Sequence, residues 1–111
     1  MNNSGRLNVT GKSPISRRLK EARLSVGISQ KKLGIAAGID EFVASARMNQ
    51  YETGKHVPDF EIVQNIAKAL NISAAFFYTT ENELAELIKI YGALSHERQQ
   101  QALLYVRELL S

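Results

Sequence analysis

Residues 27–39 read GISQKKLGIAAGI, and this stretch decides the fold. Ser29 is a favourable N-cap because its hydroxyl oxygen can accept a backbone N–H from the next turn, which predicts a short helix over residues 30–37. Gly38 follows at a chain reversal that needs a positive φ, where a residue with a Cβ would cost about 1–2 kcal/mol. Gly34 lies inside the helix, at a cost of about 1 kcal/mol relative to alanine, and so indicates that a second helix packs closely against it.

The second helix is expected to run from Asp40, its N-cap, to about Thr53, where Gly54 ends it. Its apolar residues are Phe42, Val43, Ala46, Met48 and Tyr51. Two short helices joined by a tight glycine turn are the ingredients of a helix-turn-helix, whose second helix lies in the major groove of DNA.

Apolar residues recur every three or four positions through most of the remaining chain, which predicts an all-α fold. Ser13, as N-cap, and Pro14 begin a helix that ends at Gly27. Pro58-Asp59 begin another helix, followed by a helical turn over residues 73–78; the buried stripe of the longer one is predicted to be Phe60, Val63, Ile66, Ala67 and Leu70. Residues 1–13 contain few large apolar groups, and we expect them to form a disordered arm.

Residues 80–111 are expected to form a helical hairpin. Thr80-x-x-Glu83 matches a capping box at the start of its first helix, and Ser95 caps the second. Both helices carry an apolar stripe (Leu84, Leu87, Ile88 and Tyr91 on the first; Ala102, Leu103, Val106, Leu109 and Leu110 on the second). Two interpretations stay open, because the hairpin could fold back on its own domain or form the interface of a homodimer.

The composition excludes several classes of protein. The 111 residues contain no cysteine, which removes disulfides, thiolate zinc sites and thiol nucleophiles and fits a cytoplasmic location. His56 and His96 are far apart in the chain, and no serine triad or glycine-rich phosphate loop is present. No apolar run approaches the roughly 20 residues that span a bilayer. We therefore expect no enzyme activity, no cofactor, no metal and no membrane partner.

Positive charge is concentrated in the first half of the chain. Residues 1–60 hold ten Lys or Arg against five Asp or Glu, a net charge of +5, whereas residues 61–111 hold four against six, a net charge of −2; the whole chain carries +3. A polyanion is therefore expected to bind the first half.

Several short fragments occur in order and at characteristic spacing: Gly27-Ile28-Ser29-Gln30, Leu33-Gly34, Gly38-Ile39, Tyr51-Glu52-Thr53-Gly54-Lys55 with Pro58, and Ile66-Ala67-Lys68-Ala69-Leu70-Asn71-Ile72-Ser73. With these fragments, residues 18–73 resemble the phage repressor/Cro type of helix-turn-helix protein, the XRE family. The resemblance implies a lambda-repressor-like five-helix DNA-binding domain over residues 14–79, with residues 80–111 as a C-terminal two-helix extension.

The resemblance also implies roles for individual residues. The recognition helix over residues 40–53 would contact bases, through Ser45, Arg47, Asn49 and Gln50, since amide side chains pair with adenine and arginine with guanine. Phosphates would be contacted by Gln30, Lys31, Thr53, Lys55 and His56, aided at the first two by the positive end of a helix dipole. Arg23 and Glu52 would form a structural ion pair between the first helix and the end of the recognition helix.

The sequence departs from the family at one place. Twelve residues, Asp40 to Tyr51, separate Ile39 from Glu52, where the family usually has eight. The additional four residues amount to about one helical turn, so either the recognition helix begins a turn early or the preceding loop is longer. Asp40 and Glu41 fall in this insertion, where carboxylates would repel phosphates unless they serve to cap the helix and complement its dipole.

These observations predict a sequence-specific DNA-binding transcriptional regulator. We expect a repressor that binds double-stranded DNA at a palindromic operator as a homodimer. One alternative is an antitoxin whose residues 80–111 clasp a toxin. Another is a protein-interaction module that has lost DNA binding, an interpretation that Asp40-Glu41 supports.

Overall fold

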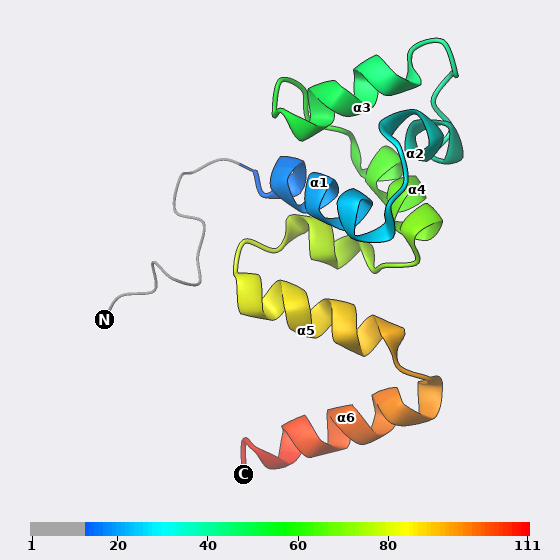
Figure 1. Cartoon of the computed structure of the whole chain (residues 1–111). Helices are drawn as coiled ribbons and strands as arrows, with labels where there is room; N and C mark the ends of the chain where they lie inside the picture. The colour runs from blue at the N-terminus through cyan, green and yellow to red at the C-terminus, as the bar shows by residue number, and fades with distance from the viewer. Residues whose placement is uncertain (1–12) are drawn as a thin grey trace.

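The computed structural model describes residues 13–111, and within that range every regular element is helical (Figure 1). The elements are α1 (Ile15–Val26), α2 (Gln30–Ala36), α3 (Ala44–Glu52), α4 (Phe60–Leu70), the 3₁₀ helix η1 (Ala74–Tyr78), α5 (Asn82–Ala93) and α6 (His96–Glu108). The all-α prediction is therefore confirmed for this range. The predicted disordered arm lies, except for Ser13, outside the described residues.

The first five elements surround one apolar core. Each contributes side chains that are almost fully buried, and the largest apolar ones are Leu19, Leu33, Met48, Val63, Ile66, Phe76 and Phe77. The two phenylalanine rings of η1 meet edge to face with their centroids 5.3 Å apart, which is a favourable aromatic geometry. Burying one such side chain is worth roughly 1.5–3 kcal/mol, so this cluster holds α1 to η1 together as one body.

Three helices begin where the sequence predicted, with Ser29, Asp59 and Ser95 as the N-caps of α2, α4 and α6. The Oγ of Ser29 accepts the N–H of Lys32 at 3.0 Å, the carboxylate of Asp59 accepts that of Ile62 at 2.9 Å, and the Oγ of Ser95 accepts that of Arg98 at 3.2 Å. Gly27 ends α1 with φ +82°, a conformation that favours glycine.

Three predicted features of α1, α4 and α5 are wrong. Pro14, not Ser13, is the N-cap of α1, although the Oγ of Ser13 still accepts the N–H of Ile15. The capping box at Thr80 does not form, because α5 has Glu81 as its N-cap without a side-chain hydrogen bond. Phe60 lies outside the core with 58% of its surface exposed and contacts the ring of Tyr78 instead.

The C-terminal hairpin lies beside this body and is built differently. In Figure 1, α5 runs along the lower side of the first five elements, and α6 lies beyond α5. Only Ala85 of α5 is buried, and no residue of α6 is buried. The hairpin therefore does not fold back to cover its apolar stripes. None of the helices in residues 13–111 combines the length and the apolar character needed to cross a bilayer.

Candidate nucleic-acid interface

The contact between α2 and α3 depends on Gly34. A Cβ at this position would lie 2.9 Å from the Cβ of Ala44 and 3.1 Å from its carbonyl oxygen. These atoms belong to the facing helix and cannot rotate away, so only glycine allows the observed spacing. Gly38 has φ +90° in the turn that follows, as its position in the sequence predicted.

The four additional residues before the recognition helix form a longer loop. The chain turns through residues 41–43, and α3 begins only at Ala44. Asp40 does not cap α3 as predicted: its carboxylate accepts the N–H of Phe42 at 3.0 Å and its carbonyl accepts that of Val43 at 3.1 Å. The side chain thus stabilises the loop, as aspartate commonly does in turns.

This loop changes the register of α3 relative to the predicted helix. The buried residues are Ala44, Met48 and Tyr51. Phe42, Val43 and Ala46 are exposed, and Phe42 retains 89% of its accessible surface. Because residues along a helix turn by about 100° each, Ala46 lies opposite the buried face, at the centre of the outward surface. The exposed face of α3 therefore includes a small apolar residue that sequence reasoning missed.

The predicted base-contacting residues all lie outside the core, but they do not point the same way. Ser45, Arg47 and Asn49 are exposed and Gln50 is half-buried. Arg47 and Asn49 project from flanks of α3 that are about 160° apart, as two residues in an α-helix must. The outward face is thus centred on Ala46, Asn49 and Gln50, with Ser45 on one side and Arg47 on the other.

A shallow hollow of about 480 Å³ brings residues of α1, α2 and α3 together. Five of the predicted DNA-contacting residues line it: Gln30, Lys31, Ser45, Asn49 and Thr53. Lys20 and the Arg23–Glu52 pair complete its wall. The hollow therefore joins basic side chains from two helices to the polar flank of α3.

Arg23 and Glu52 form a two-pronged ion pair inside this wall. The Nε of Arg23 donates to Oε2 of Glu52 at 2.6 Å and its Nη2 donates to Oε1 at 3.1 Å, with only 12% and 3% of the two side chains exposed. The hydrogen bond to Glu52 raises the pKa of Arg23 against the opposing effect of burial. Nη1 donates to the carbonyl of Ile28, so one arginine ties α1 to both the start of α2 and the end of α3.

Gln30 joins the same network. Its amide Nε2 donates to Oε1 of Glu52 at 3.1 Å and to Oδ1 of Asn49 at 3.3 Å. The side chain thereby connects the first residue of α2 to the exposed flank of α3. A hydrogen-bonded amide at this position orients the asparagine beside it, which matters because an asparagine must present a defined edge to an adenine.

The loop after α3 carries the remaining predicted contacts. Gly54 has φ +80°, and the N–H of His56 donates to the carbonyl of Gln50 at 3.2 Å, which folds the loop against the end of α3. Lys55 and His56 are exposed. His56 also lines a second hollow of about 330 Å³, together with Ser16 of α1 and Thr53. Lys55 and His56 thus lie apart from the first hollow, on the far side of Thr53.

The described part of the chain, residues 13–111, brings no three His, Asp or Glu side chains together in a way that could hold a metal ion. The charged groups near α3 are instead arranged in hydrogen bonds between helices or lie exposed. Such a surface can bind a polyanion.

Two comparisons with known proteins agree with this geometry. A family profile described as helix-turn-helix matches residues 19–77. Among solved structures, the chain is similar to the crystal structure of the transcriptional regulator BswR, with 43% sequence identity and a TM-score of 0.81 over 86% of this chain and 95% of that one. No curated protein matches the chain significantly.

Proposed function

Because the chain belongs to the helix-turn-helix family, in its XRE-type branch, and is a DNA-binding transcriptional regulator, we propose that it is a repressor that binds a palindromic operator as a homodimer. The two copies of α3 would enter successive major grooves about 34 Å apart. Bound protein would then block the access of RNA polymerase to the promoter.

The observation that carries the homodimer is the uncovered hairpin. Ten large apolar side chains of α5 and α6 are exposed: Leu84, Leu87, Ile90, Tyr91, Leu103, Leu104, Tyr105, Val106, Leu109 and Leu110. A 13-residue helix such as α6 is marginal in water by itself, because helices of that length need tertiary packing. An exposed apolar surface on this scale marks an interface.

A second copy of the chain is the occupant that fits this surface best. The hairpin offers both a row of projecting leucines and a groove of about 500 Å³ between α5 and α6, lined by Leu87, Tyr91, Leu103 and Val106. A surface with both features can pair with itself about a two-fold axis. Residues 80–111 carry three Lys or Arg against five Glu, so the hairpin would not compete with the basic domain for DNA.

We assign DNA contacts from the exposed geometry of α2, α3 and the loop that follows α3. Ser45, Asn49 and Gln50 would face base edges, and Arg47 would reach the groove from the opposite flank. Ala46 joins this set because its methyl group can contact the methyl group of thymine. The phosphates would be contacted on one side by Gln30 and Lys31, and on the other by the loop residues Thr53, Lys55 and His56.

Selection of bound sequences from a random DNA pool, using the full chain, tests this function. An inverted repeat with half-sites about 10 base pairs apart, together with a dimer in sedimentation, is the expected result. Unrelated sequences bound with equal affinity, or a monomer at every concentration, would contradict it. A hairpin that pairs stably with a co-purified toxin instead of a second copy would favour the antitoxin alternative.

Two substitutions separate base contacts from phosphate contacts. Gln50→Ala should cost roughly 1–3 kcal/mol at the selected operator and relax the sequence preference at one base pair of each half-site. Lys55→Ala should weaken binding to all sequences alike and reduce the slope of log affinity against log salt by about one per binding site. Fluorescence anisotropy at several salt concentrations measures both effects, and an unchanged affinity in either variant would remove that residue from the interface.

A further inference from the structure

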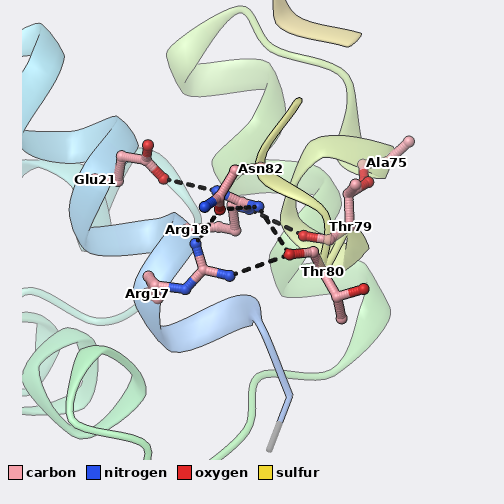
Figure 2. Close-up of polar contacts among 7 residues, drawn as sticks. All are labelled: Arg17, Arg18, Glu21, Ala75, Thr79, Thr80 and Asn82. Atoms are coloured by element: carbon pink, nitrogen blue, oxygen red, sulfur yellow. Dashed lines mark hydrogen bonds and ion pairs between the residues drawn. The ribbon is translucent and has the colours of Figure 1, made fainter. Parts of the chain in front are cut away.

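Arg18 is a charged residue inside the apolar core. Only 2% of its surface is exposed, and its guanidinium lies 5.5 Å from the centre of the Phe76 ring. Its Nε donates to the carbonyl of Thr79 at 2.9 Å and its Nη2 to the carbonyl of Thr80 at 3.3 Å (Figure 2). Those carbonyls belong to the short segment that joins η1 to α5. The hydrogen bonds of this buried charge therefore go largely to the connection between the domain and the hairpin.

The neighbouring arginine converges on the same segment. Arg17 Nη1 donates to Oδ1 of Asn82 at 2.9 Å, and Arg18 Nη2 donates to the same oxygen at 3.1 Å. Arg17 Nη2 also reaches the Thr80 carbonyl at 3.4 Å. Asn82 is the first residue of α5, so one side-chain oxygen of that helix receives two guanidinium groups from α1 (Figure 2). We call Arg17, Arg18, Thr79, Thr80 and Asn82 the arginine latch.

Stability alone does not account for such a cluster. Taking a guanidinium out of water is costly, and replacing a buried charge by an apolar side chain of similar volume often leaves a protein as stable or more so. The planar guanidinium group holds its N–H donors in a fixed geometry. Each hydrogen bond therefore restricts the position of its acceptor relative to α1. Beyond the latch, one side of α5 lies along the domain: Ala85 is buried, Ile88 packs against the core, and Lys89 lies over the Phe76 ring. The latch fixes the first turn of α5 and, with these contacts, is placed to set the angle of α5 on the domain.

Helix α1 connects the start of α5 to the end of the recognition helix. Arg18 and Arg23 are both on α1, five residues apart. One holds the start of α5 and the other holds Glu52 at the end of α3. Helix α1 therefore connects the hairpin, through Arg18, to the DNA-contacting face, through Arg23.

We propose that the arginine latch is a specificity-determining device, which sets the spacing between the two half-sites that the dimer accepts. This inference rests on the proposed function, since the hairpin must be the dimer interface for its angle to matter. Arg17, Arg18 and Asn82 act as positioning residues and need not touch DNA. A tilt of roughly 10° at the latch displaces the far end of a 12-residue helix, about 18 Å away, by about 3 Å, which is close to one base-pair step of about 3.4 Å.

Asn82→Ala is the sharpest test. It removes the oxygen shared by both arginines, and it changes an exposed residue of α5 that lies away from the candidate DNA surface. Asn82→Asp is the matched control, because it keeps an acceptor oxygen at the same place. Arg18→Met removes the other partner of Asn82, but it also leaves the half-buried Thr79 carbonyl without its donor and so serves only as a supporting variant.

The experiment measures binding of the full-length dimer to duplexes in which two copies of the selected half-site are about 8 to 13 base pairs apart, centre to centre, around the one-turn spacing. Wild type and Asn82→Asp should prefer one spacing. Asn82→Ala should lose at least about threefold of that preference, as expected when the two charge-assisted hydrogen bonds to α5 itself are lost, while binding to a single half-site stays unchanged. A purely structural role would lower both affinities together.

The possible outcomes distinguish a failure of the spacing proposal from a failure of the homodimeric repressor function. If Asn82→Ala discriminates between spacings as sharply as wild type, the latch does not set the spacing and the inference is overturned, while the repressor function stands. If wild type itself shows no preference for paired half-sites, the homodimer function fails and the inference fails with it. Equal losses at single and paired half-sites would also overturn the inference, because they indicate a general loss of folded protein.

A second measurement needs no DNA. The sequence contains no cysteine, so Gln64→Cys on α4 and Gln100→Cys on α6 give unique positions for spin labels. Labelled chains diluted into unlabelled protein should show one narrow distance distribution between the two labels in the wild-type background. The distribution should broaden with Asn82→Ala and stay narrow with Asn82→Asp. A distribution of the same width in all three backgrounds would overturn the proposal.

Discussion

The helix-turn-helix body and the C-terminal hairpin have similar apolar patterns but different surroundings. The stripe of α4 (Val63, Ile66, Ala67 and Leu70) is buried within the chain, whereas the stripes of α5 and α6 remain largely exposed. Both patterns are those of amphipathic helices, so the pattern alone does not say which partner covers each. An apolar stripe that its own chain leaves exposed therefore favours an interface with another molecule over burial within the domain.

The largest expected effect comes from shortening a core leucine. Leu33 is fully buried between α2 and its neighbours, so Leu33→Ala should lower the free energy of unfolding by about 2–5 kcal/mol. Leu104 of α6 is 59% exposed, and Leu104→Ala is the matched change in the hairpin. Thermal unfolding at several protein concentrations distinguishes the two, since Leu33→Ala should lower Tm by a similar amount at every concentration.

The hairpin variant should behave in the opposite way. If Leu104 packs against a second copy, its truncation weakens association, and the loss of Tm should depend on protein concentration. A concentration-independent loss from Leu104→Ala as large as that from Leu33→Ala would break the comparison between the two regions. It would mean that α6 is packed into the same core as α2.

A smaller effect is expected from adding a methyl group to a helical glycine in each region. Gly34→Ala forces α2 away from Ala44 and should destabilise the protein by about 1–3 kcal/mol, with a matching loss of DNA affinity. Gly92→Ala in α5 meets nothing within 4 Å and should stabilise its helix by about 0.5–1 kcal/mol. Urea unfolding measures both changes. If Gly92→Ala instead lowers the free energy of unfolding, the last turn of α5 must be approached closely by another molecule, as a second copy in the dimer would do.

The sequence predicted the fold where local chemistry and burial agree. The serine caps of α2 and α6, the glycine turns and the packing of Gly34 each depend on residues a few positions apart, which is the range where sequence patterns are reliable. The capping box at Thr80 failed because Glu81, one residue later, is the N-cap of α5, while the Thr80 carbonyl accepts a hydrogen bond from the distant Arg18. A contact between residues 62 positions apart cannot be recognised from the sequence around either residue.

The candidate site was predicted in part, for a similar reason. The exposed positions of α3 could be counted back from Tyr51 and Glu52, because the end of that helix matches the family. Its start could not, since Phe42 and Val43 look like core residues in sequence and only the loop held by Asp40 exposes them. The position of Ala46 at the centre of the outward face follows once Met48 and Tyr51 are known to be buried. Which of these residues contact DNA stays a prediction.

The smallest expected effect lies at the boundary between the two regions, at Tyr78 of η1. Burial raises the pKa of its phenol, and the negative charge of Asp59 raises it further. The folded state therefore favours the neutral phenol, whose contribution to stability is fully present below the unfolded pKa of about 10 and is lost as the pH rises through the higher folded value. Because Tyr78 is 42% exposed, solvent screening keeps this contribution small.

Urea unfolding of wild type and Tyr78→Phe between pH 8 and 11, a range chosen to span the ordinary tyrosine pKa of about 10, measures this contribution as the difference between the two proteins. Wild type should lose stability relative to Tyr78→Phe as the pH rises above about 10. Asp59→Asn should reduce that difference, because it keeps an oxygen to cap α4 and removes the charge. If the free energies of unfolding of the two proteins change in parallel between pH 8 and 11, the phenol titrates as it would in the unfolded chain. The ring contact with Phe60 then does not bury the hydroxyl group. The end of η1 would then resemble the exposed hairpin more than the core it adjoins.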